Sequence, residues 1–458
     1  MKKILAVLVF VLLAACLIAP KFIAPKYQEQ LSQLVTNLNS APSYEASLDT
    51  LEEGWFKSKS VLHLSYDLSM VDPNLYGQKL EADLVLDSRF GPLLLSDAGT
   101  IGWFDVHAYY AGDSLRETLN WPEDQAFFDA SVVMDLMGNV KSVDQIPAFD
   151  INEGDFTFSG YKGKGTFASN SLAYQGQIEQ LNLDKHDDTL QLANTQLALN
   201  IQSSAEVLTS GGFYNGDISI GFDQFSLGSQ DNPNELEVNG ASLLVSSQLD
   251  EDAQLGKIVS RYAVNNVRSD EFSADDLSLV IEMTNLSNQF FLDYKTFSDA
   301  VLADGKVSPD ELTIALFTFM TDNIDELLSH QPEMNMTEFR GRLAEGSFHA
   351  TLNSRLKDIN GPISIDQLLD QNFWLWNLMV NAKLQADETL ISHLGERYLA
   401  QQMRTTIDSP QVKQQVQMLL NNFVQQGFIK RDNDQLMTEI EIADGQGKIY
   451  DFPFPLAY

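Results

Sequence analysis

Alternating apolar and polar positions dominate most of the chain. From Leu62 to Met70 every second residue is apolar, and the same period of two returns from Leu80 to Leu86. Between Asp155 and Met283 further short runs alternate in this way, with glycines between them. Successive side chains of a strand point to opposite faces of a sheet, so this period predicts half-buried β-strands. We therefore expect a large, mostly antiparallel, curved β body.

The apolar spacing changes to a helical period in three regions. Apolar residues recur every three or four positions in Tyr27–Asn39, in Asn285–Ser329 and again after Leu384. Asn285–Ser329 is expected to hold two helices, because Ser308-Pro309-Asp310-Glu311 is a start signal for the second one. Near the C-terminus two more helices are expected, and Ser409-Pro410 begins the later of them.

Two features of the C-terminal part extend the β pattern. From Trp374 to Leu384 every second residue is apolar, which predicts a long strand with Trp374 and Trp376 on one face. We expect this face to be buried, because Leu378 continues it; exposed indoles would instead form a surface for a partner or a sugar. Asp444-Gly445 predicts a tight turn between the last two strands.

The N-terminus carries an uncharged apolar run, Ile4–Ala19, preceded by Lys2 and Lys3. Three interpretations of this run stay open: a retained membrane anchor, a lipoprotein signal that uses Cys16, and an export signal removed by ordinary cleavage. Sixteen helical residues span about 24 Å, somewhat less than the hydrocarbon core of a bilayer. The two lysines favour a cytoplasmic N-terminus, so the bulk of the chain is expected in the periplasm at the bacterial inner membrane.

Composition narrows the possible partners. Acidic residues outnumber basic ones 64 to 29 in 458 residues, a formal charge of −35. Nucleic-acid binding requires neutralising phosphates, so this charge argues against it and favours a solvated acidic surface. Cys16 is the only cysteine, so the part after the apolar run has no disulfide.

Together these patterns predict an α+β protein with an N-terminal membrane segment. The expected organisation is a signal anchor or lipoprotein signal at 1–25, a helical stalk at 26–43, a β-rich body at 44–285, a helical pair at 286–330 and an α+β part at 331–458 that continues the β body.

Motifs for chemistry are few. Asp304, Asp310 and Glu311 resemble part of a calcium-binding loop, but Ala300 and Leu302 stand where oxygen ligands are required. We therefore expect a plain helix connection and no metal or other cofactor. Asp105 and His107 would share a strand face and are the one candidate for a general-base pair. Each of the six histidines lies more than five residues from the next, so none forms a local metal motif.

The chain resembles the YdgA-like family, a bacterial domain of unknown function with an N-terminal envelope segment. The resemblance rests on the apolar start, the Pro25–Leu38 stretch, Tyr44, Gly54-Trp55-Phe56-Lys57-Ser58 leading into a strand, and Gly91-Pro92. Phe90 stands where the family usually has histidine. The family implies an exported, membrane-associated protein, and it supplies no catalytic residue to transfer.

Three functions are therefore considered. The first is a non-enzymatic envelope scaffold or interaction protein, in which self-association is one form. The second is a carrier that binds an apolar ligand such as lipid in a β-groove. The third is an envelope hydrolase. No enzymatic activity is expected.

Overall fold

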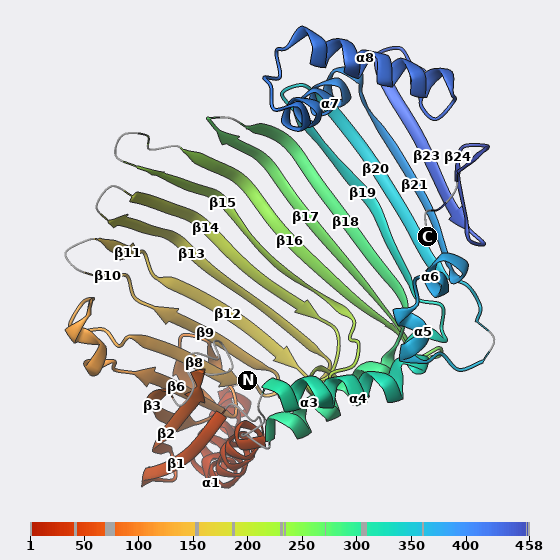
Figure 1. Ribbon diagram of the computed structural model, residues 1–458. Helices are drawn as coiled ribbons and strands as arrows, with labels where there is room; N and C mark the ends of the chain where they lie inside the picture. Colours follow the sequence, from red (N-terminus) through yellow and green to blue (C-terminus); the bar gives the residue numbers. More distant parts are fainter. Residues whose placement is uncertain are drawn as a thin grey trace. The chain divides into compact units, whose positions relative to one another are not determined.

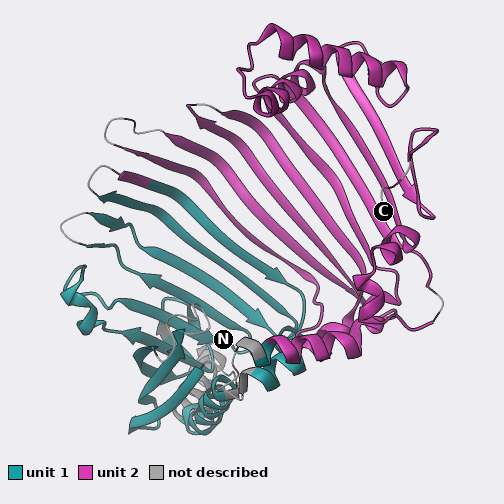
Figure 2. Ribbon diagram, viewed as in Figure 1, with its two compact units in different colours: residues 1–187, 191–209, 295–312 teal, residues 188–190, 210–294, 313–458 magenta. Residues whose placement is uncertain are grey.

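The computed structural model describes most of the chain and divides it into two compact units. It describes residues 2–40, 44–68, 78–151, 155–185, 188–229, 232, 235–270, 272–303, 309–359, 361–454 and 456, but not the side chains of residues 2–17, 40, 95, 205, 302–303 and 309–310. Unit 1 comprises Met1–Asp187, Gln191–Thr209 and Lys295–Leu312, and unit 2 comprises Asp188–Leu190, Ser210–Tyr294 and Thr313–Tyr458 (Figure 2).

Unit 1 contains an antiparallel sheet in which strands that are neighbours in sequence are also neighbours in space (Figure 1). Its long strands, in order, are β1 (Tyr44–Glu53), β2 (Lys57–Asp67), β3 (Lys79–Phe90), β6 (Phe104–Tyr110), β8 (Phe128–Met134), β9 (Val140–Ile146), β12 (Tyr161–Ala168) and β13 (Ser171–Lys185). Smaller elements are β7 (Leu119–Asn120), β10 (Phe149–Ile151), β11 (Phe156–Phe158), the 3-10 helix η3 (Asp113–Glu117), α2 (Ala205–Ser210) and a separate hairpin of β4 (Leu93–Ser96) and β5 (Gly99–Ile101). β14 (Asp188–Ile201) has residues in both units.

The N-terminal helix α1 (Lys2–Ser40) packs along the first strands of this sheet. Ile23, Tyr27 and Leu31 follow one another at helical spacing and are 2–8% exposed. Their buried partners come from β2, β3 and β6, namely Leu62, Leu86, Phe90, Phe104 and Val106. Burying each large apolar side chain contributes about 1.5–3 kcal/mol, so the sheet is what holds this part of the helix.

The strands of unit 2 are also antiparallel and pair in sequential order. Its strands are β15 (Gly216–Ser229), β16 (Leu236–Asp250), β17 (Leu255–Ser269), β18 (Ser273–Ser287), β19 (Glu333–Leu343), β20 (Gly346–Leu356), β21 (Leu378–Asp387), β23 (Gln435–Ala443), β24 (Gln446–Ile449) and β25 (Phe452–Phe454), with β22 (Lys430–Asp432) paired to β23.

Helices pack at both ends of the unit 2 strands. They are α3 (Asn288–Ala303), α4 (Pro309–Leu328), α5 (Ile365–Leu369), α6 (Gln371–Asn377), α7 (Glu388–Met403) and α8 (Pro410–Gln425). Of these, α3 and α4 have residues in both units. At one end Ile324 of α4 and Phe373 of α6 pack with Leu356, the last residue of β20. At the other end Val416 and Leu420 of α8 pack on Leu436 of β23.

The structure confirms the predicted α+β class with a large antiparallel sheet body. It also confirms the start of α4 at Pro309, the start of α8 at Pro410 and the two-residue turn at Asp444-Gly445, whose φ angles are 55° and 71°.

One strand prediction was wrong. Trp374 and Trp376 lie in helix α6, and the strand begins only at Leu378. The side chain of Asp370 accepts a hydrogen bond from the Asn372 amide at 2.9 Å and so caps this helix. Burial of Phe373 between α4 and β20 then favours the helical turn over the alternating pattern.

The predicted membrane segment Ile4–Ala19 lies largely outside the described side chains. Of its residues, only Ile18 and Ala19 have described side chains. Within the part of the chain that the structure describes, no helix combines the length and the apolar character needed to span a bilayer.

Candidate functional site

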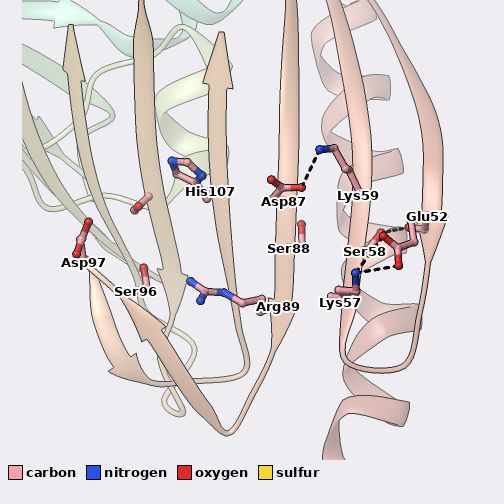
Figure 3. Close-up of a pocket in the computed structure, with 11 residues that line it drawn as sticks. Glu52, Lys57, Ser58, Lys59, Asp87, Ser88, Arg89, Ser96, Asp97 and His107 are labelled. Atoms are coloured by element: carbon pink, nitrogen blue, oxygen red, sulfur yellow. Dashed lines mark hydrogen bonds and ion pairs between the residues drawn. The ribbon is translucent and has the colours of Figure 1, made fainter. Parts of the chain in front are cut away.

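A polar cleft of about 630 Å³ lies on the unit 1 sheet (Figure 3). Lys59, Asp87 and His107 stand directly across from one another on β2, β3 and β6. Ser88, which neighbours Asp87 in β3, points the other way and bonds to the Tyr27 hydroxyl of α1 at 2.5 Å. The cleft therefore occupies the sheet face that α1 does not cover. Figure 3 shows the hairpin residues Ser96 and Asp97 across the cleft from Lys59.

The cations of this cleft are paired with carboxylates of the same chain. Lys57 lies 3.0 Å from Glu52, and Lys59 lies 3.6 Å from Asp87. Asp87 raises the pKa of the Lys59 amine above its ordinary value, so this amine stays protonated at neutral pH. An anionic ligand would have to compete with these carboxylates.

An ion pair beside the cleft joins Arg89 to a buried carboxylate. Arg89 donates to Oδ2 of Asp105 from Nη2 at 2.6 Å and from Nε at 3.1 Å. Asp105 is 1% exposed, and its Oδ1 is buried without a hydrogen-bond partner. This pair joins β3 to β6, where the two residues stand opposite each other.

The general-base pair considered for Asp105 and His107 is not formed. Asp105 is held by Arg89, and the His107 ring bonds instead to Asp129 through Nε2 at 2.6 Å. Strand alternation placed both residues on one face as expected, but cross-strand partners were closer to each of them. The partners lie 16 and 22 residues away in sequence, so no local pattern could predict them.

The other residues singled out by sequence do not converge. Asp304 and the side chains of Ile4, Cys16 and Asp310 lie outside the described part. Glu311 is exposed in the first turn of α4. No group of three or more potential metal ligands occurs among the described residues.

Three predicted residues do have described surroundings. Ala19 packs beside the α1 core. Trp374 and Trp376 are 37% and 53% exposed, so the expected burial of the indoles was wrong.

An apolar pocket of about 530 Å³ lies between α1 and the sheet of unit 1. Phe22 and Ile23 of α1 line one side of it, and Trp103 and Met134 line the other. Lys26 also lines the pocket. Its volume lies within the usual range for small-ligand sites, about 300–1,000 Å³.

A second apolar surface crosses the sheet of unit 2, and we call it the open apolar strip. One row of directly opposed residues runs across eight neighbouring strands: Ile220, Leu243, Tyr262, Leu279, Phe339, Ala350, Leu384 and Thr438. Directly opposed residues of an antiparallel pair share one face of the sheet. No residue of this row is charged. Ile220, Tyr262, Phe339 and Leu384 are 38–48% exposed, so water reaches apolar side chains along most of the row.

Helices cover the same face on either side of the strip. Leu356 lies six residues after Ala350 on the same face of β20, stands opposite Leu378 and is buried with residues of α4 and α6. At the opposite strand ends Ala386 stands across from Leu436, which α8 buries. The strip is therefore the uncovered middle of a face whose two ends are packed.

The reverse face of this sheet carries cross-strand ion pairs. Lys257 lies 2.9 Å from Glu282, and Lys383 lies 3.2 Å from Glu439. Charged side chains on this face can remain hydrated, so the face needs no covering element. Sequence alternation indicated that each strand had one apolar face, but only the register shows that these faces join in one uncovered row.

The comparisons with known proteins identify a family without assigning a site. A family model described as "Bacterial protein of unknown function (DUF945)" matches residues 1–457. Neither the curated proteins nor the solved structures contain a match to the chain. The family match extends over both units, and it names no functional residue.

Proposed function

We infer the function of this chain from the premise that it belongs to the DUF945 family of bacterial proteins of unknown function. We propose that it is a cell-envelope protein that binds a lipid acyl chain along the open apolar strip. The family membership agrees with the resemblance to the YdgA-like family. It leaves the function to be argued from the surfaces of the molecule.

The exposure of the strip is the observation that carries the proposal. Tyr262, Phe339 and Leu384 are each more than a third exposed, in the middle of a sheet face whose two ends are covered by helices. Covering apolar surface is worth about 25 cal/mol per Å², and large contiguous apolar patches on soluble domains commonly mark binding sites. A ligand that covers the row gains this free energy without desolvating any charge.

The surroundings of the strip favour a long, thin ligand. Strands lie about 4.8 Å apart, so the row from β15 to β23 extends roughly 34 Å. Helices cover the face at both strand ends, beside Leu356 and beside Leu436. An acyl chain lying across the strands fits between them, whereas a broad protein surface would meet the helices first.

The proposed location is the periplasmic side of the inner membrane, with Ile4–Ala19 retained as the anchor. Support comes from the uncharged run, from Lys2 and Lys3 before it and from the lack of any cysteine after Cys16. Lipidation at Cys16 is the alternative form of attachment.

A photolabelling experiment tests the ligand. The full chain, in mild detergent micelles, is irradiated with a phosphatidylethanolamine that carries a diazirine on its acyl chain. We expect labelled peptides from β15–β21. Phe339→Glu is expected to reduce their labelling at least about tenfold, because a carboxylate in the row must be desolvated when the chain binds.

Gln248→Glu is the matched control. It adds the same charge to β16 on the reverse face, next to Leu249, and labelling should stay at the level of the unmodified chain. Equal labelling of the Phe339→Glu and Gln248→Glu proteins, or labelling confined to other segments, would contradict the proposal.

A scaffold role is the second candidate, and the outer surface of α7 and α8 favours it. Leu394 and Tyr398 lie one turn apart on α7 and are 48% and 63% exposed, and Leu419 and Phe423 on α8 are both 41% exposed. A photoreactive phenylalanine in place of Tyr398 is expected to crosslink a protein in living cells. Its absence from any crosslinked species, with normal expression, would count against this role.

The hydrolase alternative rests on the polar cleft alone. Arg89 and His107 there are held by Asp105 and Asp129. A catalytic assignment needs groups directed at a substrate. The enzymatic hypothesis thus stays a prediction without a named residue.

A further inference from the structure

Three turns at one end of the unit 1 sheet expose large apolar side chains. Trp55 and Phe56, between β1 and β2, are 52% and 47% exposed, and Trp103, before β6, is 41% exposed. Leu136 and Met137, between β8 and β9, are 48% and 89% exposed. Isolated exposed apolar residues are ordinary, but five on three turns are a patch if the turns adjoin.

Backbone hydrogen bonds show that the turns do adjoin. The Phe90 amide donates to the Phe56 carbonyl at 2.9 Å, and the next amide, Gly91, donates to the Trp103 carbonyl at 2.7 Å. The Trp103 amide in turn donates to the Met134 carbonyl at 2.8 Å. We call the joined surface of Trp55, Phe56, Trp103, Leu136 and Met137 the turn end.

Helix α1 passes the turn end on its way toward the N-terminus. The Lys21 amine lies 5.8 Å from the centre of the Trp55 ring, and Phe22 lines the apolar pocket with Trp103. At the other end of the unit the side chain of Asn39 bonds to the Ala46 backbone near the start of β1. The uncharged run Ile4–Ala19 therefore joins the sheet at the turn end.

We propose that the turn end lies in the headgroup region of a phospholipid bilayer, beside the point where α1 enters the membrane. This inference rests on the membrane anchoring in the proposed function and adds a second contact to it. Tryptophan places its apolar ring and polar N–H favourably at this depth, and a lysine such as Lys21 keeps its amine in the headgroups.

The charges near the turn end decide which lipids it suits. Glu52 is paired with Lys57, and Asp135 accepts hydrogen bonds from the Met137 and Asn139 amides of its own turn, both at 2.9 Å. Glu53 adds a further negative charge. Among the described residues around the turn end, Glu52, Glu53 and Asp135 offset the charges of Lys21 and Lys57. The contact is therefore apolar and suits a zwitterionic bilayer.

Depth-dependent fluorescence quenching tests this contact. Single-tryptophan versions of the full chain retain either Trp55 or Trp103, with phenylalanine at the other tryptophan positions, and are placed in phosphatidylcholine nanodiscs with brominated acyl chains. Tyr44→Trp in a background without other tryptophans is the control. Tyr44 is 41% exposed, as Trp103 is, but it lies at the opposite end of β1 from Trp55 and so away from the turn end. We expect at least about threefold more quenching of Trp55 and Trp103 than of the control.

The outcomes separate this inference from the proposed function. Co-elution with nanodiscs but equal quenching at the three positions would overturn the turn-end contact alone, whereas failure to enter nanodiscs would overturn the anchoring as well. Quenching that disappears at high salt would also overturn it, because an apolar contact is insensitive to salt. Met137→Asp should reduce the quenching of Trp103, whereas Met418→Asp on α8 should not.

Discussion

Arg89→Met is expected to lower the free energy of unfolding by about 3 kcal/mol. The substitution leaves Asp105, which is 1% exposed, as a buried carboxylate without its cation. Breaking a buried pair in this way typically costs about 3–5 kcal/mol, and the 49% exposure of Arg89 places the value at the lower end. Urea unfolding of the full chain in detergent, followed by circular dichroism, measures the change.

Two comparisons make this prediction specific. Adding Asp105→Leu to Arg89→Met removes the unpaired charge and should restore most of the lost stability. Arg342→Met breaks the pair with Asp276, in which both side chains are more than 60% exposed, and should cost at most about 1 kcal/mol. If Arg89→Met lowered the free energy of unfolding no more than Arg342→Met does, the prediction that buried Asp105 requires the Arg89 charge would be wrong.

The sequence predicted the elements of this fold well because their signals are local. A period of two marks strands such as β2, and Ser409-Pro410 marks the start of α8 within two residues. Asp444-Gly445 adopts the left-handed conformations that a tight hairpin turn requires. Each of these signals is complete within one short segment.

Trp374 and Trp376 show where a local signal fails. Alternation from Trp374 to Leu384 fits a strand throughout, yet the chain is helical up to Asn377. The helix is favoured over the strand because it buries Phe373 in a core formed by α4 and β20, about 20 to 50 residues earlier in the chain. Burial against distant elements outweighed the pattern.

The candidate surfaces depend on register, which no short segment contains. Phe339 faces Leu279 and Ala350, and this placement follows from the pairing of whole strands. Within β16 and β18 the alternation of apolar positions changes phase at Gly240 and Asp276, which have positive φ and are omitted from the regular pairing. A residue of this kind interrupts the pleat, so apolar residues on both sides of it can keep one face.

Between pH 10 and 12 the free energy of unfolding of the unmodified chain is expected to fall because of Tyr27. Tyr27→Phe is expected to abolish this part of the fall. Burial raises the pKa of the Tyr27 hydroxyl from 10.0 to about 12, while its hydrogen bond to Ser88 acts in the opposite direction. Unfolded chain ionises near pH 10, whereas the folded protein keeps the proton, so unfolding releases a proton in this interval. The contribution is therefore complete below pH 10 and disappears as the pH rises through 12. It amounts to about 2.7 kcal/mol.

Unfolding free energies measured at several alkaline pH values, for Tyr27→Phe and for Tyr44→Phe, check this expectation. The pKa values of four other tyrosines are also raised, but these residues are present in both variants and cancel in the comparison; they are Tyr161, Tyr174, Tyr214 and Tyr450. Tyr44 is 41% exposed, so its variant should keep the slope of the unmodified chain. Below pH 9 Tyr27→Phe should lower the free energy of unfolding by only about 1 kcal/mol, because it removes the hydrogen bond to Ser88. Equal slopes for the two variants above pH 10 would mean that α1 leaves the sheet before the chain unfolds, because only a docked helix keeps the Tyr27 hydroxyl away from water.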